Sequence, residues 1–199
     1  MAQEKQPFAN PAAFGLTGLG VACMALGPVV AGWVKPEPPG IITAIAWAIM
    51  LGGVAQLISG IMEFANGSIL GGTAFSGYGV LWLALGLMWW MGTLGGAKLN
   101  TEVEGWVQLG YLLFSIYMTI GFAAVNTALF LVLFDIDLIF LTLALPNLGI
   151  GGPGLHTLSG LFIVVLALLS FWTAAGISCN AVYGRTIFPL GPPLVKKKA

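Results

Sequence analysis

The chain alternates long apolar runs with short breaks that are polar or rich in glycine and proline. A helix needs about 20 mostly apolar residues to cross the hydrocarbon core of a bilayer. Six runs come near or exceed this length, and their expected ranges are 14–33, 41–64, 73–95, 106–124, 127–145 and 157–183. The pattern therefore predicts an all-α membrane protein with six transmembrane helices and a helix break between the second and third spans.

The breaks between these runs differ in how clearly the sequence marks them. Consecutive prolines in the segment 35–40 cannot continue a helix, so the first break is firm. From Trp106 to Leu145 the residues are almost all apolar, which is too long for one span. Asn126-Thr127 is the polar interruption near the middle of this run, so we predict a tight turn there.

The distribution of lysine and arginine predicts an orientation. Positive charges concentrate near the two ends of the chain, and fewer occur in the loops on the expected opposite side; these residues are Lys5, Arg185 and Lys196 to Lys198, against Lys35 and Lys98. Cytoplasmic loops carry an excess of lysine and arginine. We therefore expect a cytoplasmic-membrane protein with a cytoplasmic segment 1–13, a transmembrane domain 14–184 and a cytoplasmic tail 185–199.

Composition narrows the function. Hydrophobic residues make up 58% of the chain and charged residues only 7%, whereas soluble domains carry about 25% charged residues. The formal net charge is zero, which offers no case for nucleic acid as a partner. Cys23 and Cys179 are too few for a metal site or a disulfide framework, so we expect no metal and no cofactor. A membrane-embedded enzyme or quinone-binding subunit stays as the alternative, although His156 is the single histidine.

Asn10-Pro11-Ala12 opens the first span and has two interpretations. Asparagine is a good N-cap and proline suits the first helical position, so the motif can simply start a helix. A helix N-terminus also presents free N–H groups and the positive end of its dipole to an anion. Asn10 is therefore a candidate substrate-binding residue, with Pro11 as a structural one.

The segment 60–79 combines glycines, hydroxyl groups and aromatic rings at the expected helix break. Broken backbone at membrane depth is tolerated only where protein or a water-filled cavity satisfies it. Thr73, Ser76 and Tyr78 would offer hydroxyl donors to a carboxylate, and Phe75 would face a methyl group. The alternative is an ordinary interfacial loop with aromatic residues.

Asp135 and Asp137 lie in the middle of the fifth expected span. Intramembrane carboxylates are functional candidates by default. Because the two residues are two positions apart, they leave a helix about 200° from one another, so only one can face a pore. They are proton-relay candidates. Alternatively, the span edges lie elsewhere and both reach the interface, or they pair at a contact between subunits.

Three motifs resemble the signatures of the acetate uptake transporter family, which includes bacterial acetate/succinate permeases. They are Asn10 to Leu16, the two stretches 52–64 and 72–79, and Tyr183 to Gly191. The resemblance implies a six-helix protomer with its own pore, assembled as a homohexamer. It also implies an apolar constriction at Leu19, Tyr78 and Ile136, and a role for Glu63 in stabilising the helix break.

The resemblance implies passage of acetate and related short carboxylates, with succinate as a further candidate. An apolar constriction accommodates a methyl group, but burying a bare carboxylate there is very costly. Protonating a carboxylic acid with a pKa of about 4.3 at pH 7 costs about 3.7 kcal/mol. Passage of the neutral acid, or of the anion with a proton, is therefore reasonable, and a hydrated ring would pass the anion as a channel does.

Overall fold

The computed structural model describes residues 6–35 and 37–195, so Lys5 and Lys196 to Lys198 lie outside the described residues. The described elements are helices in the order α1 (Ala12–Val30), α2 (Pro38–Trp47), η1 (Ala48–Ala55), α3 (Gln56–Ala65), α4 (Ile69–Thr93), α5 (Thr101–Phe122), α6 (Thr127–Asn147) and α7 (Gly154–Tyr183). The elements α2, η1 and α3 join into one span, which gives six helices long and apolar enough to cross a membrane in this part of the chain. The expected six-span all-α fold is confirmed.

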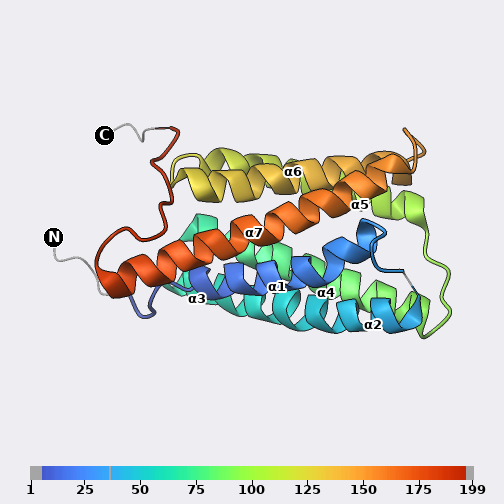
Figure 1. Ribbon diagram of the computed structural model, residues 1–199, viewed down its shortest axis with the longest axis horizontal. Helices are drawn as coiled ribbons and strands as arrows, with labels where there is room; N and C mark the ends of the chain where they lie inside the picture. The colour runs from blue at the N-terminus through green and yellow to red at the C-terminus, as the bar shows by residue number, and fades with distance from the viewer. Residues whose placement is uncertain (1–5, 36, 196–199) are drawn as a thin grey trace.

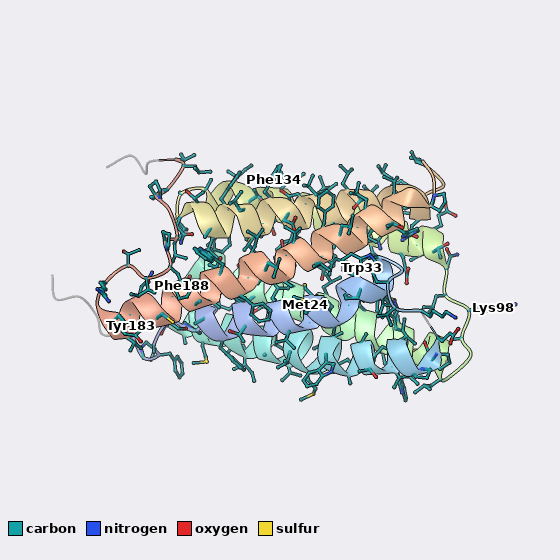
Figure 2. All side chains as sticks on the ribbon, viewed as in Figure 1. Met24, Trp33, Lys98, Phe134, Tyr183 and Phe188 are labelled. Carbon is teal, nitrogen blue, oxygen red and sulfur yellow. The ribbon has the colours of Figure 1, made fainter. Side chains whose placement is uncertain are left out.

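The helices lie side by side along the long axis of the molecule (Figure 1). Because each span reverses the direction of the one before it, α1, α4 and α6 begin at one end of the bundle, where α7 also ends. We call this end the proximal end and the opposite one the distal end. Large apolar side chains such as Phe134 project outward along the bundle, whereas Lys98 lies in the loop at the distal end (Figure 2).

The break between the second and third spans is a short turn and not an unwound segment. It comprises residues 66–68, and α4 already begins at Ile69. Ser68 caps α4, since its hydroxyl accepts a hydrogen bond from the N–H of Gly71 at 3.2 Å. Gly67 takes a φ of +78°, which favours glycine. The expected break between the second and third spans is therefore present, but it is shorter than the gap between residues 64 and 73 that the sequence indicated, because the cap and the turn glycine complete the reversal within residues 66–68.

The turn predicted between the fourth and fifth spans is present. The helix α5 ends at Phe122 and α6 begins at Thr127. The side chain of Asn126 accepts a hydrogen bond from the N–H of Leu129 at 2.9 Å, which is the ordinary capping pattern for asparagine. The polar interruption in the long apolar run thus starts a helix.

The middle of the second span is a π-helical segment, η1, which the sequence pattern did not predict. Gly52 and Gly53 lie in it, and a Cβ atom at either position would come within 2.5 Å of the side chain of Trp82 or Leu83 on α4. Small residues let helices approach closely in lipid. The glycines therefore bring η1 against α4 at the level of Trp82.

The longest helix, α7, packs most extensively against α1. At Gly160 a Cβ atom would lie 2.1 Å from the backbone nitrogen of Ala31, so the two backbones meet there. At Gly27 on the partner helix, a Cβ atom would lie 2.7 Å from the side chain of Val164. The glycines of these spans thus act as packing positions.

The residues after α7 fold back over the bundle. Gly184 ends the helix with a φ of +62°, as is usual for a glycine after a helix. The side chain of Asn180 accepts hydrogen bonds from the N–H groups of Ile187 and Phe188, at 2.7 and 3.0 Å. Trp172 donates its indole N–H to the carbonyl of Pro189 at 3.0 Å. We call residues 184–195 the C-terminal strap.

The strap continues to the turn between α5 and α6. Thr127 donates its hydroxyl to the carbonyl of Pro192 at 2.7 Å, and the N–H of Ala128 donates to the carbonyl of Leu190 at 2.8 Å. The N–H of Leu194 reaches the carbonyl of Ala123 at 2.8 Å. As far as Val195, the segment expected as a tail is therefore bound to the helical bundle.

Candidate transport pathway

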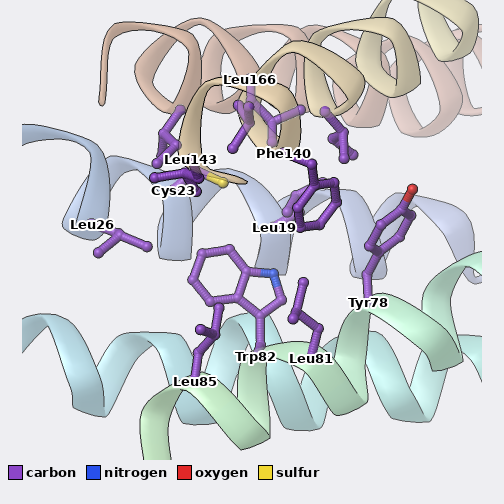
Figure 3. Close-up of a pocket in the computed structure, with 13 residues that line it drawn as sticks. Leu19, Cys23, Leu26, Tyr78, Leu81, Trp82, Leu85, Phe140, Leu143 and Leu166 are labelled. Atoms are coloured by element: carbon purple, nitrogen blue, oxygen red, sulfur yellow. The ribbon is translucent and has the colours of Figure 1, made fainter. Parts of the chain in front are cut away.

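The three residues of the expected constriction line one cavity of about 70 Å³ in the middle of the bundle, which we call the central cavity. Leu19 comes from α1, Tyr78 from α4 and Ile136 from α6. The rest of the wall consists of apolar side chains and the Cys23 thiol, and Trp82 lies at its floor in the view of Figure 3. Three helices far apart in the sequence thus meet at one apolar site.

The aromatic ring of Tyr78 is held by two neighbours. The ring of Phe114 on α5 meets it edge-on at a centroid distance of 5.0 Å, and Phe140 on α6 stacks at 6.5 Å. Offset and edge-to-face pairs at these distances are favourable. The Tyr78 hydroxyl points away from the other labelled side chains of the cavity (Figure 3). The ring face, and not the hydroxyl, therefore borders the cavity.

A wider cavity of about 510 Å³ lies toward the distal end, and we call it the distal vestibule. It shares Leu26, Phe140 and Ile163, among others, with the central cavity, so the two adjoin. Polar side chains line its outer part: Glu104, Gln108, Asn147 and His156. Asn147 donates its amide to the Gln108 carbonyl oxygen at 2.9 Å. Neither Gln108 nor Asn147 was among the site residues expected from the sequence.

A cavity of about 620 Å³ lies at the proximal end, and we call it the proximal vestibule. Its wall includes the first residues of α4 and the residues that precede α1 and α6. Asn10, Glu63, Asn126 and Leu190 of the strap line it. Among the described residues it shares no lining residue with the central cavity. The central cavity therefore adjoins the distal vestibule directly, whereas the proximal vestibule is a separate cavity at the other end of the bundle.

The Asn10-Pro11 motif lies at the edge of the proximal vestibule. The side chain of Asn10 accepts a hydrogen bond from the N–H of Ala12 at 3.0 Å, and the carbonyl of Pro11 accepts from Phe14. The segment before it is fixed as well, because Phe8 and Asn66 exchange two hydrogen bonds. The motif therefore starts α1, and its exposed asparagine also faces the vestibule.

The predicted residues around the second turn separate into two groups. Phe75 and Glu63 line the proximal vestibule, and the Glu63 carboxylate lies against Gly71 in the first turn of α4. Ser76 instead packs against Gly60 of α3. Thr73 and Ser76 line none of the three cavities that the described residues form. A binding role for these two hydroxyls therefore stays a prediction that the geometry does not favour.

The two aspartates of α6 face different neighbours. Asp135 is buried near Cys23 of α1, and Asp137 accepts a hydrogen bond from the Thr119 hydroxyl of α5 at 2.8 Å. Neither lines the central cavity or the vestibules formed by the described residues. Their side chains diverge as the helical spacing predicts, and the intervening Ile136 is the one that faces the central cavity.

Residues 1–186 match the GPR1/FUN34/yaaH family. The chain belongs to this family. The succinate-acetate/proton symporter SatP of Escherichia coli K12 is 32% identical to it over 92% of this chain and 95% of the relative. The acetate permease A of Emericella nidulans is 28% identical over 88% of this chain and 63% of the relative.

A solved structure supports the family assignment. The bacterial acetate channel SatP matches this structure with a TM-score of 0.85 and 29% identity, covering 92% of this chain and 99% of that chain. The ammonia transport outward protein 2 of Saccharomyces cerevisiae is another relative, 30% identical over 94% of this chain and 67% of the relative. The resemblance seen in the sequence motifs is confirmed at the level of the family and the fold.

Proposed function

We propose that this protein passes acetate and related short carboxylates, including succinate, across the cytoplasmic membrane. The observation that carries the proposal is the meeting of Leu19, Tyr78 and Ile136 at one apolar cavity between two vestibules, in a chain with the fold of a bacterial acetate channel. We expect no enzymatic activity, since the named relatives include a symporter and a permease.

The shape of the pathway suits a solute with one apolar and one polar end. A methyl group fits an apolar ring, whereas a bare carboxylate loses its hydration there. The amides of Gln108 and Asn147 in the distal vestibule, and Asn10 and Asn126 in the proximal one, offer hydrogen-bonding groups before and after the ring. A carboxylic acid can therefore shed its water at the constriction and recover polar partners beyond it.

The form that crosses the ring decides between symport and channel. Protonating the carboxylate costs about 3.7 kcal/mol at pH 7, which is a modest price beside the burial of an unpaired charge. We favour passage of the neutral acid, with the proton lost again in the far vestibule. A ring that admits water would instead let the anion pass alone.

We also propose that each protomer carries its own pathway and that the protein assembles as a homohexamer. Support comes from the cavities, whose walls come from the helices of one chain. Large apolar side chains remain exposed on the outer faces of the helices, including Leu113 of α5 at 69% and Ile120 at 69%. Lipid and neighbouring protomers would cover these faces, and we expect both termini in the cytoplasm.

Radiolabelled acetate uptake into proteoliposomes tests the proposed function. We expect uptake above that of empty liposomes, faster when the outside is more acidic than the inside. Unlabelled succinate should compete, and ammonium should not. Uptake no greater than in empty liposomes, from folded protein, would overturn the proposal.

A further inference from the structure

A group of buried oxygen atoms lies behind the ring of Tyr78, between α4, α5 and α6. The Thr119 hydroxyl donates to one carboxylate oxygen of Asp137 at 2.8 Å. The hydroxyl of Ser115, about one turn earlier on α5, lies beside both the Tyr78 hydroxyl and the Asp137 carboxylate. Tyr78 and Ser115 are buried, with exposed fractions of 5% and 0%. We call Ser115, Thr119 and Asp137 the anchor cluster.

The free oxygens of this region have few other partners. The hydroxyls of Tyr78 and Ser115 and the second carboxylate oxygen of Asp137 are all buried, and none has a hydrogen-bond partner within the described residues. A buried polar group without a partner is destabilising. Because the three groups lie together, small rotations would make them one another's partners. The hydroxyl end of Tyr78 is therefore attracted to the anchor cluster.

This attraction acts on the constriction through the tyrosine ring. Phe114 and Phe140 hold the ring from the sides, and the anchor cluster holds its far end. A tyrosine side chain has only two rotatable bonds before the hydroxyl, so these contacts together leave one orientation. Asp137 directly follows Ile136, which means that one turn of α6 supplies both a wall of the central cavity and an anchor for the opposite wall.

We propose that Ser115, Thr119 and Asp137 are positioning residues that hold Tyr78 across the constriction and so set the size of the carboxylate that passes. Thr119 orients the Asp137 carboxylate, and Asp137 with Ser115 holds the Tyr78 hydroxyl. None of the three lines the cavities of the described chain, so each acts through the ring. The inference rests on the proposed function, because the ring must lie in the path of the solute.

The test compares the ratio of succinate to acetate uptake in proteoliposomes for Ser115→Ala, Tyr78→Phe and the double variant. Each single variant removes one of the two hydroxyls that we propose to pair, so we expect the ratio to rise about five-fold, which corresponds to a hydrogen bond of about 1 kcal/mol. Residues that act through one contact are not additive. The double variant should therefore show the same ratio as Tyr78→Phe alone.

Two further variants separate positioning from general destabilisation. Ser159→Ala makes the same substitution at an equally buried serine, whose hydroxyl contacts Thr142 at 2.7 Å and lines none of the three cavities. It should keep the wild-type ratio. Thr119→Ser keeps the hydroxyl that orients Asp137 and should keep the ratio too, whereas Thr119→Val should raise it.

The outcomes distinguish failure of the positioning role from failure of the proposed transport function. If the wild-type protein does not take up acetate, the proposed function fails. If it does, but Ser115→Ala and Tyr78→Phe keep the wild-type ratio in folded protein, the positioning role is wrong. A double variant whose ratio is the product of the two single effects would also contradict it. Should Ser115→Ala not fold, the comparison of Thr119→Ser with Thr119→Val decides.

Discussion

The three side chains of the expected constriction all present apolar groups to the central cavity, but they differ in how freely they can move. Leu19 and Ile136 present flexible aliphatic groups to the central cavity, whereas Tyr78 presents a flat ring fixed by Phe114 and Phe140. A fixed ring cannot move aside for a larger solute as a leucine side chain can. We therefore expect Tyr78 to control size more than the other two residues.

Truncating the ring should widen the path. Replacing Tyr78 by alanine removes the largest of the three side chains at the constriction, and Leu19→Ala removes a smaller volume. We expect both variants to raise acetate flux and to admit larger dicarboxylates, with the larger change for Tyr78→Ala. Liposome uptake of carboxylates of increasing length measures this. Wild-type size selectivity in both folded variants would remove these residues from the pathway.

The aspartates of α6 allow a second residue-level prediction. A proton relay needs a carboxylate that the solute or its proton can reach, and Asp137 lies beside the Tyr78 hydroxyl, whereas Asp135 is near Cys23. If a relay operates, Asp137→Asn should flatten the pH dependence of acetate uptake. Asp135→Asn should keep that dependence and change mainly thermal stability. Wild-type pH profiles in both variants would make the aspartates structural.

At the scale of elements, a substitution that adds one methyl group tests the packing of α7 on α1. A Cβ atom at Gly160 would lie 2.1 Å from the backbone of Ala31. Overpacking costs about 1–3 kcal/mol, so Gly160→Ala should lower the unfolding temperature in detergent. At Gly110 of α5, a Cβ atom meets nothing within 4 Å, so Gly110→Ala is the matched control. Equal unfolding temperatures for the two variants would contradict this close approach.

The sequence predicted the helical elements well because their cause is local. Apolar runs of bilayer length are visible without knowing the fold, and Asn126 starts α6 as capping chemistry predicts. The π-helical segment η1 was not predictable, because its backbone depends on how Trp82 packs against Gly52. The strap was missed since a segment rich in proline and glycine has no helical periodicity.

The sequence predicted those residues of the candidate site that could be aligned with the family. Leu19, Tyr78 and Ile136 were aligned from the resemblance, and they do line one cavity. It was harder to predict from the sequence which neighbour a helical side chain faces. Ser76 was expected to face a solute, but the start of α4 at Ile69 and the packing of the helices turn it toward Gly60.

At the scale of the whole molecule, orientation is the most direct property to test. In the variant Lys98→Cys, the new cysteine lies in the distal loop and should react with a membrane-impermeant maleimide added to intact cells. In the variant Arg185→Cys, the new cysteine lies at the start of the strap and should react only after the membrane is permeabilised. The native Cys23 is buried, but Cys179 is partly exposed near the end of α7, so both variants are made in a Cys179→Ser background. The reverse pattern would place the termini outside the cytoplasm.

Assembly can be measured on the same purified protein. We expect native mass spectrometry in mild detergent to show a hexamer, because exposed apolar side chains such as Leu113 and Ile120 leave the protomer with uncovered faces. In lipid, such faces associate through packing and not through the hydrophobic effect, so detergent choice matters. Monomers alone across several mild detergents would count against the hexamer.

The C-terminal strap places a constraint on biosynthesis. Its partners are Ala123 in the turn before α6 and Thr127 and Ala128 at the start of α6, so they are made before the rest of α6 and before α7. The residues that bind them emerge from the ribosome only after α7. The turn between α5 and α6 therefore lacks its hydrogen bonds to the strap while α6 and α7 enter the membrane. The proximal vestibule gains Leu190 as a wall residue only after α7 has been made, so the strap completes a cavity that the earlier spans began.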